Sequence, residues 1–123
     1  MANEGSIRAV LKMTKGDIVR SFDSGSLKYD ISESAAVGLV TLILTDSYAS
    51  LSKGSITTAR YLYILNVHAS ASALISMDGG STQTITVPAG LPALIPLASG
   101  LTFTNIQAKV ATGAGSIDYA VLP

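Results

Sequence analysis

Apolar and polar residues alternate along most of the chain, with the period of two that is typical of β-strands that bury one face. The clearest example is residues 26–31, where Leu27, Tyr29 and Ile31 share one parity and polar residues take the other. The same alternation is present in residues 7–13, 18–22, 82–87 and 117–121. The pattern predicts an all-β protein.

Two segments are apolar on both faces, residues 37–45 (VGLVTLILT) and residues 61–67 (YLYILNV). A period alone leaves a buried helix open, but the β-branched and aromatic residues favour strands. Such a strand is either central, with its outer face capped by another segment, or it places one set of side chains in a protein–protein interface. We favour the interface for residues 37–44, because few residues remain for a covering layer. The candidate interface residues are Leu39, Val40, Leu42 and Ile43.

Glycine and proline residues mark the turns between the strands. Gly79-Gly80 predicts a tight hairpin, and Pro96 predicts that residues 93–97 form an edge strand. The apolar phase slips within residues 101–110, which predicts a bulge or corner near residues 104–105. One helical turn is expected in residues 47–53. About ten short strands at roughly ten-residue spacing predict an antiparallel β-sandwich of the jelly-roll kind.

The length of 123 residues fits one domain. We therefore expect a single sandwich over residues 1–123, with residues 1–5 as a flexible N-terminal tail. The N-terminal sequence has no basic segment followed by an apolar one, so no signal peptide is predicted. The longest apolar run is much shorter than the ~20 residues of a membrane helix, so no membrane partner is expected.

The composition indicates a surface with few charged residues. Hydrophobic residues make up 48% of the chain and charged residues only 13%, against about a quarter in typical soluble domains. A surface of this kind favours packing against other chains, so a homo-oligomer is expected. Eight basic residues balance eight acidic ones without a basic run, so we expect no nucleic-acid partner.

Candidate chemistry is sparse. His68 is the single histidine and cysteine is absent, which excludes zinc sites built from nitrogen and sulfur ligands. Residues 23–30 only faintly resemble a calcium loop, because the closing glutamate is missing. A pair of glycosidase carboxylates stays open, although Glu4 and Glu33 are the only glutamates. We expect no catalytic residue, no cofactor and no metal, and therefore a protein that is not an enzyme.

The second half of the chain carries a series of recognisable turns and strand ends. They are Gly54-Ser55-Ile56-Thr57, an apolar strand ending at Asn66, Ile75-Ser76-Met77-Asp78-Gly79-Gly80, Val87-Pro88-Ala89-Gly90 and Gly115-Ser116-Ile117-Asp118-Tyr119-Ala120-Val121. In this order residues 55–123 resemble the small β-sandwich virion proteins of tailed bacteriophages, which include capsid decoration (cement), tail and adaptor proteins. The resemblance covers just over half of the chain, its turns suit many sandwiches, and residues 1–54 match no family.

The resemblance implies a structural role in repeated, symmetric copies. The expected function is that of a capsid decoration or cement protein, made in the host cytoplasm and located in the virion, where it stabilises a phage head. Its expected partners are further copies of itself, as a trimer, and the major capsid protein or another virion protein. The alternatives are a phage tail, head–tail adaptor, ring or fibre-anchoring protein, and a carbohydrate- or receptor-binding module that uses some of the five tyrosines.

Overall fold

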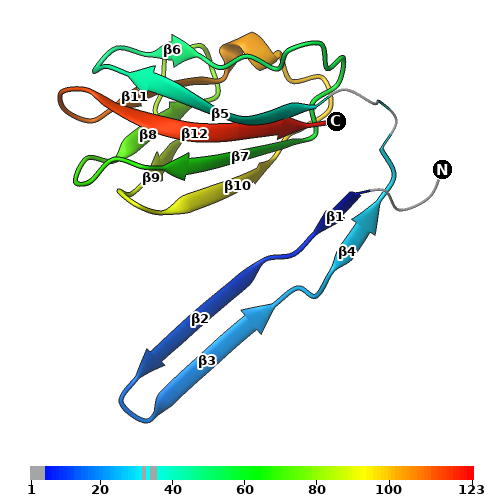
Figure 1. The fold of residues 1–123 in the computed structure, drawn as a ribbon, viewed down its shortest axis with the longest axis vertical. Helices are drawn as coiled ribbons and strands as arrows, with labels where there is room; N and C mark the ends of the chain where they lie inside the picture. Colours follow the sequence, from blue (N-terminus) through cyan, green and yellow to red (C-terminus); the bar gives the residue numbers. More distant parts are fainter. Residues whose placement is uncertain (1–4, 32, 34–35) are drawn as a thin grey trace. The chain divides into compact units, whose positions relative to one another are not determined.

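The computed structural model describes residues 5–31, 33 and 36–123 (Figure 1). Within these residues every strand pairing is antiparallel, and the only helical element is a three-residue 3₁₀ turn. No helix in this part of the chain is long and apolar enough to cross a membrane. The prediction of an all-β antiparallel sandwich is confirmed.

The chain divides into two compact units, residues 1–34 and residues 35–123. The sandwich strands all come from the second unit. This differs from the expected single sandwich over residues 1–123. Of the expected tail, residues 1–4 lie outside the described residues, whereas Gly5 is the first residue of a strand.

The first unit is one long hairpin, here called the arm (residues 5–31). Two ladders follow each other along it, and its turn contains Gly16 at φ +58°, a conformation that glycine adopts without a Cβ clash. The strands are β1 (Gly5–Ile7), which pairs with β4 (Leu27–Tyr29), and β2 (Val10–Lys15), which pairs with β3 (Ile18–Asp23).

The second unit consists of two four-stranded sheets, whose buried side chains form one core. The first sheet has the order β10-β7-β12-β5, with β5 (Val37–Leu44), β7 (Tyr61–Asn66), β10 (Pro92–Pro96) and β12 (Gly115–Leu122). The second has the order β6-β11-β8-β9, with β6 (Ala49–Ser50), β8 (Ala73–Ser76), β9 (Ile85–Val87) and β11 (Gln107–Val110).

The core lies between the two sheets and is built from alternate residues of their strands. Leu62, Ile64 and Ile117 of the first sheet and Ile75 and Val110 of the second are fully buried. Each such side chain contributes about 1.5–3 kcal/mol relative to leaving it exposed. The apolar residues of the period-two pattern in this unit are therefore buried between its own two sheets.

Several local predictions can now be compared with the structure. Pro96 lies in β10, which is an edge strand, and a 3₁₀ turn at Phe103–Asn105 forms the predicted corner. The prediction of a helical turn in residues 47–53 is wrong, because β6 (Ala49–Ser50) pairs there with β11. The polar residues around β6 fit a short edge strand equally well, since its exposed face needs no apolar residue.

Candidate functional site

The arm has one predominantly apolar face. In an antiparallel ladder, residues directly opposite each other place their side chains on the same face. Leu11 pairs with Phe22, Met13 with Arg20 and Lys15 with Ile18, so these six side chains share a face. We call Leu11, Met13, Ile18 and Phe22 the apolar arm face. Val10 and Val19 lie on the opposite face among polar residues, namely Lys12, Thr14, Ser21 and Asp23.

The apolar arm face is open to solvent. Leu11 is 69% exposed and Phe22 is 64% exposed, and about half of Met13 and Ile18 is exposed. Every residue of β2 and β3 is exposed. An isolated two-stranded hairpin is marginally stable at best in water. The arm therefore carries an apolar surface that is exposed in the structure.

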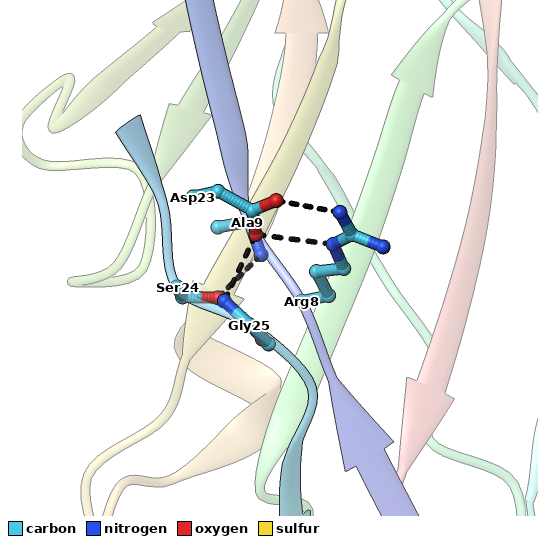
Figure 2. A network of polar contacts seen from close by, with 5 residues as sticks. All are labelled: Arg8, Ala9, Asp23, Ser24 and Gly25. Carbon is cyan, nitrogen blue, oxygen red and sulfur yellow. Dashed lines mark hydrogen bonds and ion pairs between the residues drawn. The ribbon is translucent and has the colours of Figure 1, made fainter. Parts of the chain in front are cut away.

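A polar network stabilises the arm where the β1–β4 ladder gives way to the β2–β3 ladder (Figure 2). The guanidinium of Arg8 pairs with both carboxylate oxygens of Asp23, with 3.1 Å between Nε and Oδ1. The N–H of Ala9 donates to Oγ of Ser24 at 2.9 Å, and the N–H of Ser24 donates to the carbonyl of Ala9 at 3.0 Å. These contacts join the two ladders into one hairpin.

The network also occupies the carboxylate that begins the faint calcium-loop pattern. Asp23 accepts from Arg8 and from the N–H of Gly25, at 2.9 Å. The Arg8 guanidinium first, and the Gly25 amide second, hold the pKa of Asp23 below its ordinary value. Among the described residues, no group of three or more histidine, cysteine, aspartate or glutamate side chains is arranged to hold a metal ion.

The outer face of the first sheet is also apolar. The pairings of Tyr63 with Leu94 and with Ala120, and of Leu122 with Tyr61, define its rows. The apolar sheet face, as we call it, consists of Leu39, Ile43, Tyr61, Tyr63, Leu65, Leu94, Ala120 and Leu122. Its single charge is Asp118, the only charged residue in the four strands of this sheet, and Thr41 Oγ1 donates to Asp118 Oδ1 at 2.6 Å.

The four candidate interface residues divide between the two faces of β5. Leu39 and Ile43 lie on the apolar sheet face and are 63% and 77% exposed. Leu42 packs against the core, and Val40, opposite Tyr119, has the same parity but is 41% exposed. Participation of any of them in an interface stays a prediction, but the geometry separates Leu39 and Ile43 from the core side.

An irregular register between β5 and β12 changes the parity at the start of β5. The pairing moves from Tyr119 with Val40 to Val121 with Val37, which is a β-bulge. Val37 consequently packs against the core, although strict alternation groups it with Leu39. β5 is an edge strand and not a central one, and Leu39 and Ile43 on its outer face are exposed.

His68 holds a loop through hydrogen bonds of its imidazole ring. Its Nδ1 accepts the N–H groups of Ser70 at 3.0 Å and Ala71 at 2.8 Å. This leaves the proton on Nε2, which lies 3.1 Å from the carbonyl of Ala114 and donates to it. Both ring nitrogens are thus engaged by backbone groups.

Asn66 is a buried polar residue whose role the sequence analysis did not recognise. It is fully buried, and its Nδ2 donates to the carbonyls of Ala71 and Val87, each at 2.9 Å. Its Oδ1 accepts the N–H of His68 at 3.0 Å. Asn66 therefore ties the end of β7 to β9 and to the loop that His68 also holds.

Ser76 and Asp78 stabilise the β8–β9 connection. The buried Ser76 hydroxyl donates to Asp78 Oδ1 at 2.7 Å and accepts the N–H of Gly80 at 2.9 Å. The N–H of Thr82 donates to the same carboxylate oxygen at 2.8 Å. The Ser76 hydroxyl, followed by the Thr82 amide, lowers the pKa of Asp78. The carboxylate is thus committed to the turn, where Gly79 and Gly80 have the predicted positive φ.

Three surface hollows are lined by described residues. One of about 660 Å³ lies on the arm around Leu11, Phe22 and Asp23. Two smaller ones, about 180 and 280 Å³, lie near Thr58 and Ala59 in the sandwich. None of these three is lined by a histidine or by two carboxylates.

Comparisons of the chain with family models, with curated proteins and with solved structures found no match. The arrangement of the described residues is therefore the basis for a functional proposal. Its main feature is a pair of exposed apolar faces, one on each unit. The sequence contained a signal for the arm face, because Leu11 and Met13 alternate with polar residues as core strands do. Alternation alone does not distinguish a strand of the arm from a strand of the sandwich.

Proposed function

We propose that the protein is a non-enzymatic structural protein that assembles through apolar β-sheet surfaces. The observation that carries this proposal is the exposure of the apolar arm face and the apolar sheet face in one charge-poor chain. Monomeric soluble proteins rarely expose contiguous apolar patches larger than a few hundred Å². Larger patches of this kind are typical of protein–protein contacts.

Within that class, we propose a capsid decoration protein of a tailed bacteriophage, located in the virion. The support for this narrower proposal is the resemblance of residues 55–123 to small virion sandwiches. The near absence of charge on the outer face of the first sheet also fits broad, flat contact with a protein shell. The partners would be further copies of this chain and the major capsid protein.

Binding of the purified protein to heads that lack it tests this proposal. The protein should co-sediment with the heads to saturation and cover the shell in particle images. Ile43→Asp should weaken this binding, whereas Thr86→Asp, an exposed strand position on the second sheet, should leave it unchanged. Absence of binding to heads would contradict the decoration function.

The second candidate, a tail, adaptor or ring protein, predicts a different result in the same images. Density would then occur at one ring or along the tail, and not over the shell. The third candidate, a carbohydrate-binding module, draws on Tyr61 and Tyr63, which lie on the apolar sheet face. A glycan array would give hits that Tyr63→Ala removes, and an array without hits would count against it.

A further inference from the structure

We propose that the arm of one chain packs its apolar face onto the apolar sheet face of a second copy of the same chain. This inference rests on the proposed assembly function and names the partner of both surfaces. Each chain carries one arm and one sheet face. Arm exchange between copies therefore covers every apolar face without requiring a different protein.

The two surfaces match in chemistry. The arm contributes Leu11, Met13, Ile18 and Phe22, all of which are about half exposed or more. The sheet contributes aliphatic and aromatic side chains from all four of its strands, including Leu39, Ile43, Tyr63, Leu94 and Leu122, each at least 36% exposed. Sheets that pack face to face bury such side chains in a layer about 10 Å thick.

The lengths of the strands also match. At about 3.4 Å per residue, a six-residue strand such as β2 or β3 extends roughly 20 Å, and an eight-residue strand such as β5 or β12 roughly 27 Å. The β2–β3 ladder is therefore short enough to lie along β5 and β12 of the sheet face.

The charges on the two faces are complementary. Arg20 lies on the apolar arm face, opposite Met13, and Lys15 is next to it on the same face. The sheet face carries a single charge of the opposite sign, Asp118. Arg20 Nη1 donates to the carbonyl of Val19 at 2.9 Å, and no ion pair within the described residues engages it. A desolvated pair between Arg20 and Asp118 would fix the register of the packing, since charged pairs set specificity more than affinity.

The arm–sheet contact is isologous if two chains exchange arms reciprocally about a two-fold axis, and heterologous if each chain gives its arm to one neighbour and receives the arm of another. Heterologous contacts between identical chains generate a closed ring if the rotation closes and an open filament if it does not. The trimer expected from the phage resemblance is one such ring. A two-fold dimer by contact of two identical arm faces would instead bring Arg20 near its own copy.

The first test measures the mass of the full-length protein by light scattering over a range of concentrations. The unsubstituted protein should form an oligomer. Phe22→Asp should weaken self-association by more than about tenfold, because it buries an unpaired charge. Val19→Asp is the matched control, with 61% exposure against 64% for Phe22, on the opposite face of β3. The proposal is overturned if the unsubstituted protein is monomeric, or if both variants associate equally well.

A charge exchange tests the register. Arg20→Asp and Asp118→Arg should each weaken association, and the double variant should restore it. Circular dichroism of the variants establishes that they remain folded. Single variants that weaken association without any recovery in the double variant would overturn the Arg20–Asp118 contact.

A disulfide experiment identifies which chain covers the sheet face. The chain contains no cysteine, so introduced thiols are the only ones present. Mixed Arg20→Cys and Asp118→Cys chains should form a disulfide between the two different variants under mild oxidation. Exclusive coupling between two Arg20→Cys chains would overturn the proposal in favour of arm–arm contact. Formation of only an intramolecular disulfide in the double variant would overturn it in favour of packing within one chain.

These measurements use purified protein without phage particles, so their outcome is separate from that of the head-binding experiment. A protein that exchanges arms but does not bind heads retains the inference and loses the decoration function. A protein that binds heads as a monomer retains the proposed function and loses arm exchange.

Discussion

The arm and the sandwich use the same alternation of apolar and polar residues with opposite results. In the sandwich, alternate residues from two sheets meet and form a core that includes Ile64 and Ile75. In the arm, the corresponding residues, such as Leu11 and Phe22, remain exposed. Alternation predicts that one face of a strand will be buried. It does not identify the chain that buries it.

The two regions also differ in their content of charged residues. Residues 1–34 contain five of the eight basic and five of the eight acidic residues, whereas the much longer remainder contains three of each. In the arm, Arg8 forms an ion pair with Asp23. The sandwich instead leaves an almost uncharged sheet face, which is typical of the centre of an interface.

The largest expected effect separates a core isoleucine from an exposed one. Ile64→Ala should destabilise the protein by about 2–5 kcal/mol, because it leaves a cavity in the packed core. Ile43→Ala, at a side chain 77% exposed, should change the stability of the monomer by less than about 0.5 kcal/mol. Chemical denaturation at a protein concentration that keeps the chain monomeric measures both. Equal losses would place Ile43 in a covered environment within its own chain.

A second prediction concerns the buried amide. Asn66→Ala should cost about 2–4 kcal/mol, because the carbonyls of Ala71 and Val87 lose their donors in a dry environment. Asn105→Ala, at an exposed amide, is the control and should have little effect. Thermal or chemical unfolding gives the difference, and a similar loss for both variants would show that the hydrogen bonds of Asn66 do not stabilise the sandwich.

Two glycines provide a third, smaller comparison. A Cβ at Gly115 would clash with Cδ2 of His68, so Gly115→Ala should cost about 1–3 kcal/mol in displaced packing. A Cβ at Gly25 of the arm meets nothing within 4 Å, but its φ of +68° makes Gly25→Ala cost about 1 kcal/mol in backbone strain. The variant that combines Gly115→Ala with His68→Ala should lose less free energy of unfolding than the two single variants lose together. Strict additivity would contradict the proposed clash.

The smallest expected effect is a loss of stability at acid pH, to which one aspartate in each region contributes. The pKa values of Asp23 in the arm and Asp78 in the sandwich are lowered by their partners. Their contributions to stability are therefore fully present above the unfolded-state pKa of about 3.9 and are lost as the pH falls through the lowered native values. Carboxylate titration by NMR should give native pKa values below that reference. Arg8→Gln should return Asp23 toward it and leave Asp78 unchanged.

Most of the fold could be predicted from local patterns, and its division into units could not. The strands, the positive φ of Gly79 and Gly80, the edge position of Pro96 and the corner near residues 104–105 follow from backbone chemistry within a few residues. The predicted tight hairpin at Gly79-Gly80 is wrong, because residues 77–84 form a longer loop between β8 and β9. The alternation in residues 7–13, 18–22 and 26–31 also predicts strands in the arm. Their separation from the sandwich depends on contacts distant in sequence, for which alternation carries no information.

The candidate surfaces were predicted only in part. Residues 37–44 are apolar on both faces, which indicates an interface, and Ile43 and Leu39 are exposed in the structure. The assignment of faces required the register with β12 and its bulge, which turns Val37 toward the core. The arm face was not anticipated, because its residues look like those of any half-buried strand.

The sequence by itself determined that this is an all-β protein with little charge, because strand period and turn chemistry are local properties. Tertiary structure decided which alternating faces meet, since that depends on the pairing of β5, β7, β10 and β12 in one sheet and of β2 with β3 in another, within the part of the chain that the structure describes. The same apolar period therefore produces a closed core in one unit and an open face in the other.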